Sequence, residues 1–172
     1  IIKAYENSGV LVLELDPSSS ESMKTIEDSI IRLGRYPWGK SLDTELTSKT
    51  YKRLDEYISK TDLSLDVLKQ MRPWVVMLQL SMTEMIRLGY SPDLGIDQYF
   101  LKKAKEENKT VVELESAQAQ MALLAKDDKA FQDKLLFYTL ESMHEMEPML
   151  NDMFTSWKKG NAEAFDKIMS KP

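Results

Sequence analysis

The predicted fold class follows from VLVLELD, residues 10–16. This stretch is almost purely aliphatic and is bounded by Gly9 and Pro17, a pattern typical of a short strand buried on both faces. The comparable run is TVVELE, residues 110–115, and the long stretch between the two runs is helical in its pattern. The two strands are therefore predicted to be parallel members of an α/β sheet. Because two strands alone do not make a stable sheet, we expect them to pair either with strands outside this fragment or with another chain.

The rest of the chain carries the three- and four-residue apolar spacing of amphipathic helices. Helices are predicted at about 20–33, 47–59, 64–69, 73–88 and 94–107, and after the second strand at about 116–125, 127–158 and 162–169. Another helix is expected to be under way at Ile1, which is not an initiator methionine, and to end before Gly9. The predicted fold is a single α/β domain over residues 1–172 that is predominantly helical. It has a large helical insertion at about 20–107 and C-terminal helices at about 116–169, one of them long.

The composition excludes several classes of protein. The formal net charge of −5 and the absence of a dominant Lys/Arg cluster argue against a nucleic-acid surface. The chain has no cysteine, which rules out disulfides, thiolate catalysis and Cys-ligated metals but leaves the cellular compartment open. Its longest apolar run, WVVML at 74–78, is far shorter than the roughly 20 residues of a membrane span. We expect no membrane span in this chain.

GRYPWGKS, residues 34–41, fits the phosphate-binding pattern G-x-x-x-x-G-K-[ST]. The residues that make the match are Gly34, Gly39, Lys40 and Ser41. A working phosphate loop follows a buried strand and opens a helix, because backbone N–H groups must surround the phosphates. Here an amphipathic helix comes first, and Pro37 removes one backbone donor. We interpret the segment as a connector that binds no nucleotide, in which Gly34 ends a helix, Pro37 and Gly39 turn the chain, and Ser41 or Asp43 begins the next segment.

The only histidine, His144, follows Glu141 with the E-x-x-H spacing of di-iron helical bundles. A di-iron site needs that pair twice, together with two more carboxylates, and there is no second histidine. A Ser/His/Asp triad also lacks support, because the chain has no G-x-S-x-G elbow. We interpret His144 as a surface or helix-capping residue.

Carboxylates stand at the carboxyl ends of both predicted strands. They are Glu14 and Asp16 on the first strand and Glu113 and Glu115 on the second. Ligands of open α/β sheets bind beyond these ends, and a carboxylate in an apolar strand needs a cation, a metal or hydrogen-bond donors. Two interpretations stay open: a ligand site, or simple solvation at a sheet edge with ion pairs to arginine. The candidate arginines are Arg32, Arg72 and Arg87.

The predicted helix at 127–158 carries a continuous apolar stripe. The stripe consists of Leu136, Leu140, Met143, Met146, Leu150, Met153 and Trp157. Packing in the core or against another helix is the main interpretation. The alternatives are a Met-rich groove that binds a peptide and a homodimer formed through this face.

Several segments, in order along the chain, carry a resemblance to a known family. They are LVLELDP, WGKSL, RPWVVMLQLS, YSPDLGIDQYFLKKAKEENKTVVELESAQAQ and SWKKGN. The most specific are G-[IV]-D before a helix, at Gly95 to Asp97, and K-x-V-x-x-L-E-[ST]-x-x-x-Q, at Lys109 to Gln120. Together they resemble the central part of the TraB/PrgY/GumN family, to which the Tiki metalloproteases are related. The resemblance runs through essentially the whole chain and implies a fragment of a larger TraB/GumN-like domain.

The resemblance implies metal-assisted hydrolysis of peptides. The family's divalent metal is held by the histidines of two G-x-x-H motifs and by an acidic residue, and neither motif occurs in this chain. One motif is expected before Ile1 and the other beyond Pro172, so this chain alone is expected to be inactive and metal-free. Glu14 is the candidate for the metal-binding or general-base carboxylate.

Other positions match the family with less specific implications. Asp97, Glu115 and Gln118 stand at family-typical positions and are the candidate substrate-binding residues, whereas the segment from Arg72 to Trp74 is interpreted as structural. Family members without protease activity imply the alternative of a non-enzymatic domain that binds or regulates peptides or pheromones. The resemblance also suggests a bacterial extracytoplasmic or cell-surface setting.

Overall fold

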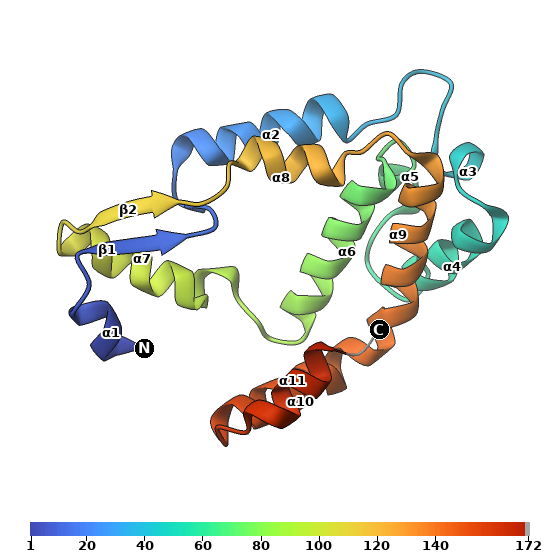
Figure 1. Cartoon of the computed structure of the whole chain (residues 1–172). Helices are drawn as coiled ribbons and strands as arrows, with labels where there is room; N and C mark the ends of the chain where they lie inside the picture. The colour runs from blue at the N-terminus through green and yellow to red at the C-terminus, as the bar shows by residue number, and fades with distance from the viewer. Residues whose placement is uncertain (171–172) are drawn as a thin grey trace.

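The two predicted strands form a two-stranded parallel sheet in the computed structural model, which describes residues 1–170 (Figure 1). Strand β1 (Val10–Leu13) pairs with β2 (Thr110–Glu113), so that Val10 lies opposite Thr110 and Leu13 lies opposite Glu113. Parallel pairing places the carboxyl ends of both strands at the same edge of the sheet. The predicted class, α/β and predominantly helical, is confirmed.

The helices lie close to their predicted positions. They are α1 (Ile2–Glu6), α2 (Ser20–Leu33), α3 (Leu42–Glu45), α4 (Ser48–Ile58), α5 (Leu65–Leu68), α6 (Pro73–Arg87), α7 (Ile96–Glu106), α8 (Ala117–Leu124), α9 (Lys129–Ser142), α10 (Met146–Lys158) and α11 (Ala162–Met169), with 3₁₀ turns η1 (Pro92–Leu94) and η2 (Met143–Glu145). Side-chain caps explain several starts: Ser19, Thr47 and Asp128 each accept from a backbone N–H in the first turn of α2, α4 and α9. The short helix α3 is an addition to the predicted set.

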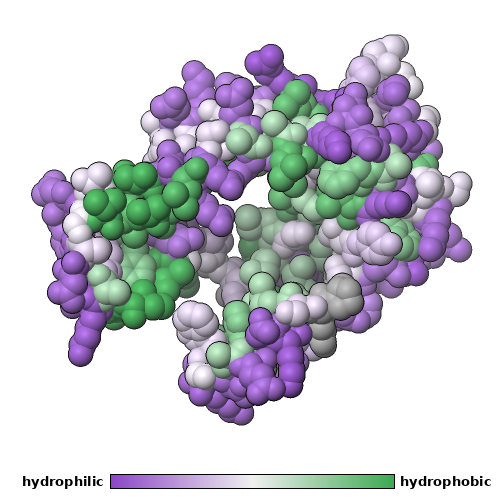
Figure 2. Space-filling view, in the orientation of Figure 1, coloured by the Kyte–Doolittle hydropathy of each residue, from purple (hydrophilic) through white to green (hydrophobic). Residues whose placement is uncertain are grey.

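One face of the sheet is covered and the other is open. Leu11 and Val111 pack against a small core formed by Tyr5, Phe100 and Ala104 of helices α1 and α7. On the opposite face the exposed valines are Val10, Val12 and Val112, which are 45%, 50% and 42% exposed. Figure 2 shows apolar surface over this part of the molecule. The expected burial on both faces is therefore wrong for the outer face, because no element of residues 1–170 covers it.

The main core lies in the helical part of the chain, away from the sheet. Buried leucines, Ile58 and Val76 from α3, α4, α5, α6 and α9 form one cluster with Met143 of η2. Helices α2 and α8 pack side by side and link this cluster to the sheet (Figure 1). The space-filling view shows open space between the sheet and the helical cluster (Figure 2).

The predicted single helix at 127–158 is wrong, because η2 interrupts it between α9 and α10. Pro148 lies in the first turn of α10, where a missing N–H is tolerated, whereas inside a continuous helix it would leave the carbonyl four residues earlier without its donor. The apolar stripe is accordingly divided: Leu136, Leu140 and Met143 are buried, whereas Trp157 on α10 is 61% exposed.

The interpretation of residues 34–41 as a connector is confirmed. Gly34 is the C-cap of α2, and a Cβ built on it would lie 2.5 Å from the carbonyl oxygen of Ile30. Gly39 has φ +83°, in the left-handed region that favours glycine. Ser41 begins α3 through a capping box with Thr44. The segment thus joins two helices and does not follow a strand.

Candidate functional site

The parallel pairing brings the four strand-end carboxylates to one edge of the sheet. The backbone N–H of Glu115 donates to the carbonyl oxygen of Glu14 at 3.0 Å, which continues the ladder past both strands. The backbone N–H of Asp16 donates to Oε1 of Glu113 at 2.6 Å. Residues nearly a hundred positions apart in sequence are thus in direct contact at this edge.

Three of these carboxylates, those of Asp16, Glu113 and Glu115, already accept hydrogen bonds within the chain. Asp16 accepts from the backbone N–H and the hydroxyl of Ser18 at 2.8 and 2.6 Å, and Lys105 Nζ lies 4.0 Å from its second oxygen. Glu113 accepts from Ser22 Oγ at 3.4 Å in addition to the backbone N–H of Asp16. These contacts hold the loop after β1 against β2, which is a structural role for both side chains.

Glu115 and Glu14 differ in their surroundings. Glu115 accepts from Nε2 of Gln120 at 3.1 Å. Glu14 is exposed, and its carboxylate makes no hydrogen bond or ion pair with any of the described residues. Among the four carboxylates at the strand ends, Glu14 is therefore the one whose oxygens remain available to a ligand.

The arginines that sequence reasoning offered as partners bind elsewhere. Arg72 Nη1 lies 2.6 Å from Asp127, and Arg87 pairs with Glu84 and Glu147. The ion-pair interpretation is wrong for these two arginines, because α6 holds both of them in the helical part of the molecule. The cation that does approach the strand ends is Lys105 of α7.

The candidate substrate-binding residues lie toward the same end of the sheet. Helix α7 runs antiparallel to the β2 strand that follows it, so its first turn, with Asp97, lies toward the carboxyl ends of the strands (Figure 1). Gln118 lies in the first turn of α8, two residues after the N-cap Ser116. Asp97, Glu115 and Gln118 are all exposed. Their predicted role in binding substrate remains a prediction.

His144 lies far from this edge, in η2 between α9 and α10 (Figure 1). Its side chain is 76% exposed, with Nε2 3.7 Å from Glu145. Glu141, the other residue of the E-x-x-H pair, lies 2.6 Å from Nη1 of Arg53. The interpretation of His144 as a surface residue agrees with this position.

The described residues do not by themselves form a metal centre. No group of three or more His, Cys, Asp or Glu side chains within residues 1–170 is placed to hold a metal ion. The strand ends offer one unengaged carboxylate and no histidine, whereas the metal sites of hydrolases combine several such ligands. A metal implied by the resemblance would therefore need ligands besides Glu14.

Sequence reasoning missed the polar residues that fix this edge. Ser22, Lys105 and Gln120 each contact a strand-end carboxylate or its loop. Of these, the Glu115–Gln120 contact lies within one short segment, and the K-x-V-x-x-L-E-[ST]-x-x-x-Q pattern already contains both residues. The other two contacts join distant segments, and no local spacing indicates them.

An apolar groove lies away from the strand ends. It lies between α10 and α11, has a volume of about 710 Å³, and is lined by Trp157, Phe165 and Met169 together with Ile1. The rings of Trp157 and Phe165 pack with centroids 6.1 Å apart. Within the described residues no helix is both long enough and apolar enough to cross a membrane.

Comparison with known proteins agrees with the resemblance. The model of the TraB/PrgY/gumN family matches residues 1–171. Two proteins named "Uncharacterized protein YbaP", from Escherichia coli (strain K12) and Shigella flexneri, are each 26% identical to this chain over 158 residues. These alignments cover 91% of this chain and 56% of each relative, so the chain spans about half the length of the curated relatives it matches. No solved structure gives a significant match. The chain belongs to the TraB/PrgY/gumN family.

Proposed function

We propose that this chain is the carboxylate-bearing part of a metal-dependent hydrolase that acts on peptides, with Glu14 as its functional carboxylate. The observation that carries the proposal is the contrast at the strand ends, where Asp16, Glu113 and Glu115 are engaged and Glu14 is not. An exposed carboxylate beside the edge where α/β sheets bind ligands is suited to take a proton from water or to bind a cation.

The surroundings of Glu14 support this role. The hydrogen bond from Glu115 N–H to the Glu14 carbonyl fixes the backbone that carries the side chain. Asp97 and Gln118 lie toward the same end of the sheet and are exposed, as substrate-contacting groups must be. A divalent metal, when bound, would polarise the scissile carbonyl, and its remaining ligands would come from residues other than those described. Membership of the family is also the basis for proposing a bacterial extracytoplasmic or cell-surface setting.

The test compares two charge-neutralising variants in the product of the complete reading frame. Glu14→Gln removes the proposed carboxylate, and Glu27→Gln removes an exposed carboxylate from the neighbouring helix α2. Hydrolysis of a fluorogenic peptide library would be followed after loading with Zn²⁺ or Mn²⁺ and again after chelation. We expect Glu14→Gln to lower kcat/KM at least about 100-fold, with the Glu27→Gln rate close to that of the wild type. Equal rates for the two variants would remove Glu14 from the mechanism.

A non-enzymatic function is the second candidate, and the apolar groove between α10 and α11 favours it. Its aromatic and methionine lining suits the apolar side chains of a bound peptide. A binding domain of this kind would retain peptides in equilibrium dialysis, lose them on Trp157→Ala, and be indifferent to Glu14→Gln. Metal-loaded protein that binds peptides without cleaving them would favour this function over the hydrolase.

A further inference from the structure

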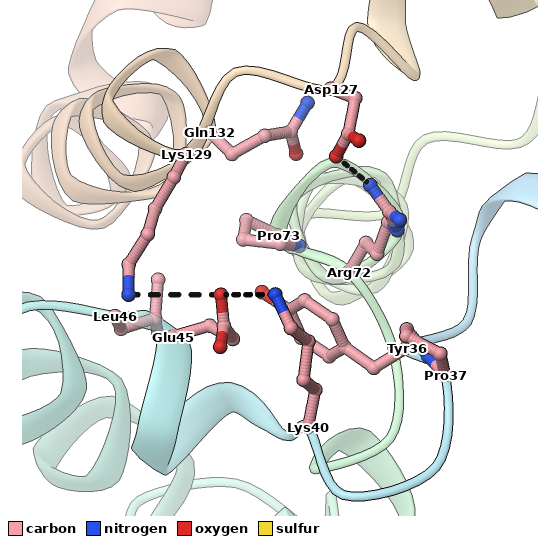
Figure 3. A pocket seen from close by; sticks show the side chains of 10 residues that line it. All are labelled: Tyr36, Pro37, Lys40, Glu45, Leu46, Arg72, Pro73, Asp127, Lys129 and Gln132. Carbon is pink, nitrogen blue, oxygen red and sulfur yellow. Dashed lines mark hydrogen bonds and ion pairs between the residues drawn. The ribbon is translucent and has the colours of Figure 1, made fainter.

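A small polar pocket lies in the helical part of the molecule, on elements distinct from the strand ends (Figure 3). Its volume is about 180 Å³. Four segments form it: the connector 34–41, the end of α3, the start of α6, and the beginning of α9 with the turn before it. The connector, whose sequence matches a phosphate-loop pattern, thus contributes Tyr36, Pro37 and Lys40 to a pocket that side chains from several segments line.

Backbone hydrogen bonds hold the connector in place beside α6. The N–H of Tyr36 donates to the carbonyl of Gln70 at 2.9 Å, and the N–H of Arg72 donates to the carbonyl of Gly34 at 2.7 Å. The N–H of Leu42 donates to the carbonyl of Lys69 at 3.0 Å. The wall of the pocket is therefore anchored at both of its ends.

The lining carries more positive than negative charge. Three cations, Lys40, Arg72 and Lys129, face two carboxylates, Glu45 and Asp127, which leaves one positive charge in a chain whose net charge is −5. Lys40 and Lys129 lie on either side of Glu45, at 3.3 and 3.6 Å from Oε2 (Figure 3). Both distances exceed the 2.7–2.9 Å typical of a charge-assisted hydrogen bond. The two ammonium groups can therefore turn to another anion without breaking a strong contact.

Arg72 and Tyr36 supply further donors. Arg72 Nη1 donates to Asp127 at 2.6 Å, whereas Nη2 stays accessible and makes no hydrogen bond with any of the described residues. A tyrosine hydroxyl is protonated at neutral pH, and burial raises the pKa of Tyr36 further, to about 12. Arg72 is also the N-cap of the 15-residue helix α6, and the positive end of that helix adds to the field in the pocket.

We propose that this pocket binds a small oxyanion, the carboxylate or phosphate group of a ligand, between Arg72 and the pair Lys40 and Lys129. A planar guanidinium with an unpartnered N–H suits two oxygens of one anion, and two flexible lysines neutralise its charge. A volume of 180 Å³ is well above the roughly 10–15 Å³ that a cavity needs to hold one water molecule, so it admits the anionic group and leaves any larger body outside. This function goes beyond the proposed hydrolase site and does not depend on it.

Isothermal titration of the chain with acetate and with inorganic phosphate tests the proposal, with chloride at equal ionic strength as the reference. The informative variant is Lys40→Gln combined with Lys129→Gln. The matched control is Lys52→Gln combined with Lys167→Gln, which removes two exposed lysines from pairs outside the pocket. Arg72→Lys forms a second variant that keeps the charge but loses the planar donor pair.

We expect acetate or phosphate to bind in preference to chloride. The Lys40/Lys129 variant and Arg72→Lys should each weaken binding by at least about tenfold, whereas the Lys52/Lys167 control should bind like the wild type. Preference for acetate identifies a carboxylate ligand, and preference for phosphate identifies a phosphate ligand. Equal heats for all three anions, or equal losses in the pocket and control variants, would overturn the proposal. Circular dichroism confirms that each variant is folded before it is titrated.

Discussion

The backbone N–H of Trp74 donates to the side-chain oxygen of Gln132 at 3.0 Å, in the interior of the helical cluster. The amide nitrogen of Gln132 donates in turn to the carbonyls of Leu124 and Lys126 at 2.8 and 3.1 Å. One buried glutamine thus joins the first turn of α6 to the turn between α8 and α9. It satisfies two backbone groups at helix ends, the Trp74 N–H and the Leu124 carbonyl, and adds a second bond to the Lys126 carbonyl, which also accepts from the Asp128 N–H at 2.9 Å.

Replacing this glutamine should destabilise the fold. Gln132→Leu keeps most of the volume but leaves the Trp74 N–H and the Leu124 carbonyl without these partners, so we expect the free energy of unfolding to fall by about 2–3 kcal/mol. Gln132→Glu keeps the acceptor for Trp74 and loses the two donated bonds. Urea denaturation measures both changes, with the exposed Gln79→Leu on α6 as a control that should change little. A Gln132→Leu variant as stable as its control would contradict this role.

Gly34 should tolerate no side chain. A Cβ at this position would lie 2.5 Å from the Ile30 carbonyl oxygen and 2.6 Å from Cγ2 of Val75. We therefore expect Gly34→Ala to lower the free energy of unfolding by about 1–3 kcal/mol through overpacking. Gly9→Ala is the matched control, because nothing lies within 4 Å of a Cβ built there. Comparing the two variants by thermal denaturation separates the steric cost from the general effect of removing a glycine.

The pair of Glu84 and Arg87 should make stability depend on pH. The Arg87 guanidinium donates to the buried Glu84 at 2.9 and 2.7 Å and lowers the pKa of that carboxyl below its ordinary value of 4.5. A carboxyl with a lowered folded-state pKa contributes stability above pH 4.5, and this contribution is lost as the pH falls through the folded-state pKa. Glu84→Gln should therefore cost about 1 kcal/mol at pH 7 and progressively less below pH 4.5.

Replacing Arg87, the other residue of this pair, should cost more stability than replacing Glu84. Arg87→Gln leaves the Glu84 carboxylate buried without its cation, so it should destabilise the protein at pH 7 more than Glu84→Gln does. Glu163→Gln, in an exposed pair with Lys167 at 2.8 Å, serves as the control and should show no comparable pH dependence. Denaturant titrations at neutral and acidic pH would reject this account if the Glu84 and Glu163 variants behaved alike.

The apolar residues of α10 and α11 predict self-association. Phe154, Trp157 and Met169 are 55%, 61% and 61% exposed, and exposed apolar patches of this kind commonly mark interfaces. The homodimer predicted through the Met-rich face would use this part, because Leu136, Leu140 and Met143 are already buried within the chain. We expect Phe154→Glu to weaken association at least about tenfold in sedimentation equilibrium. Trp38→Glu, at a fully exposed aromatic in the connector, should leave association unchanged, and a wild-type chain that remains monomeric would remove the prediction.

Local patterns predicted most of the fold. The aliphatic runs bounded by turn residues located both strands, and the apolar spacing located most of the helices, because both signals arise from neighbouring residues. The interruption at η2 was also readable in principle, since Pro148 limits where a helix can continue. The apolar spacing continues across Pro148 and therefore predicted an uninterrupted helix. Apolar spacing reports which residues share a helix face and carries no information about a missing backbone N–H.

The sequence predicted which residues make up the candidate site, but it did not predict which of their carboxylates form hydrogen bonds or ion pairs. The strand-end rule placed Glu14, Asp16, Glu113 and Glu115 together, and the parallel register confirms that placement. Which carboxylates form hydrogen bonds or ion pairs depends on Ser18, Ser22, Lys105 and Gln120, and the contacts of Ser22 and Lys105 join segments that are distant in sequence. The distinction of Glu14 from its neighbours is therefore a tertiary result.

Local sequence patterns predict the helical class, the two aliphatic strands, the connector at 34–41 and the resemblance to the family, because each rests on the order of nearby residues. Tertiary packing sets the open outer face of the sheet and the pairing of Arg72 and Arg87 away from the strand ends. It also forms the polar pocket, whose charged lining residues are Lys40, Glu45, Arg72, Asp127 and Lys129. Burial, ion pairing and cavities depend on which distant segments meet. That is set by the packing of the whole chain and by no local pattern.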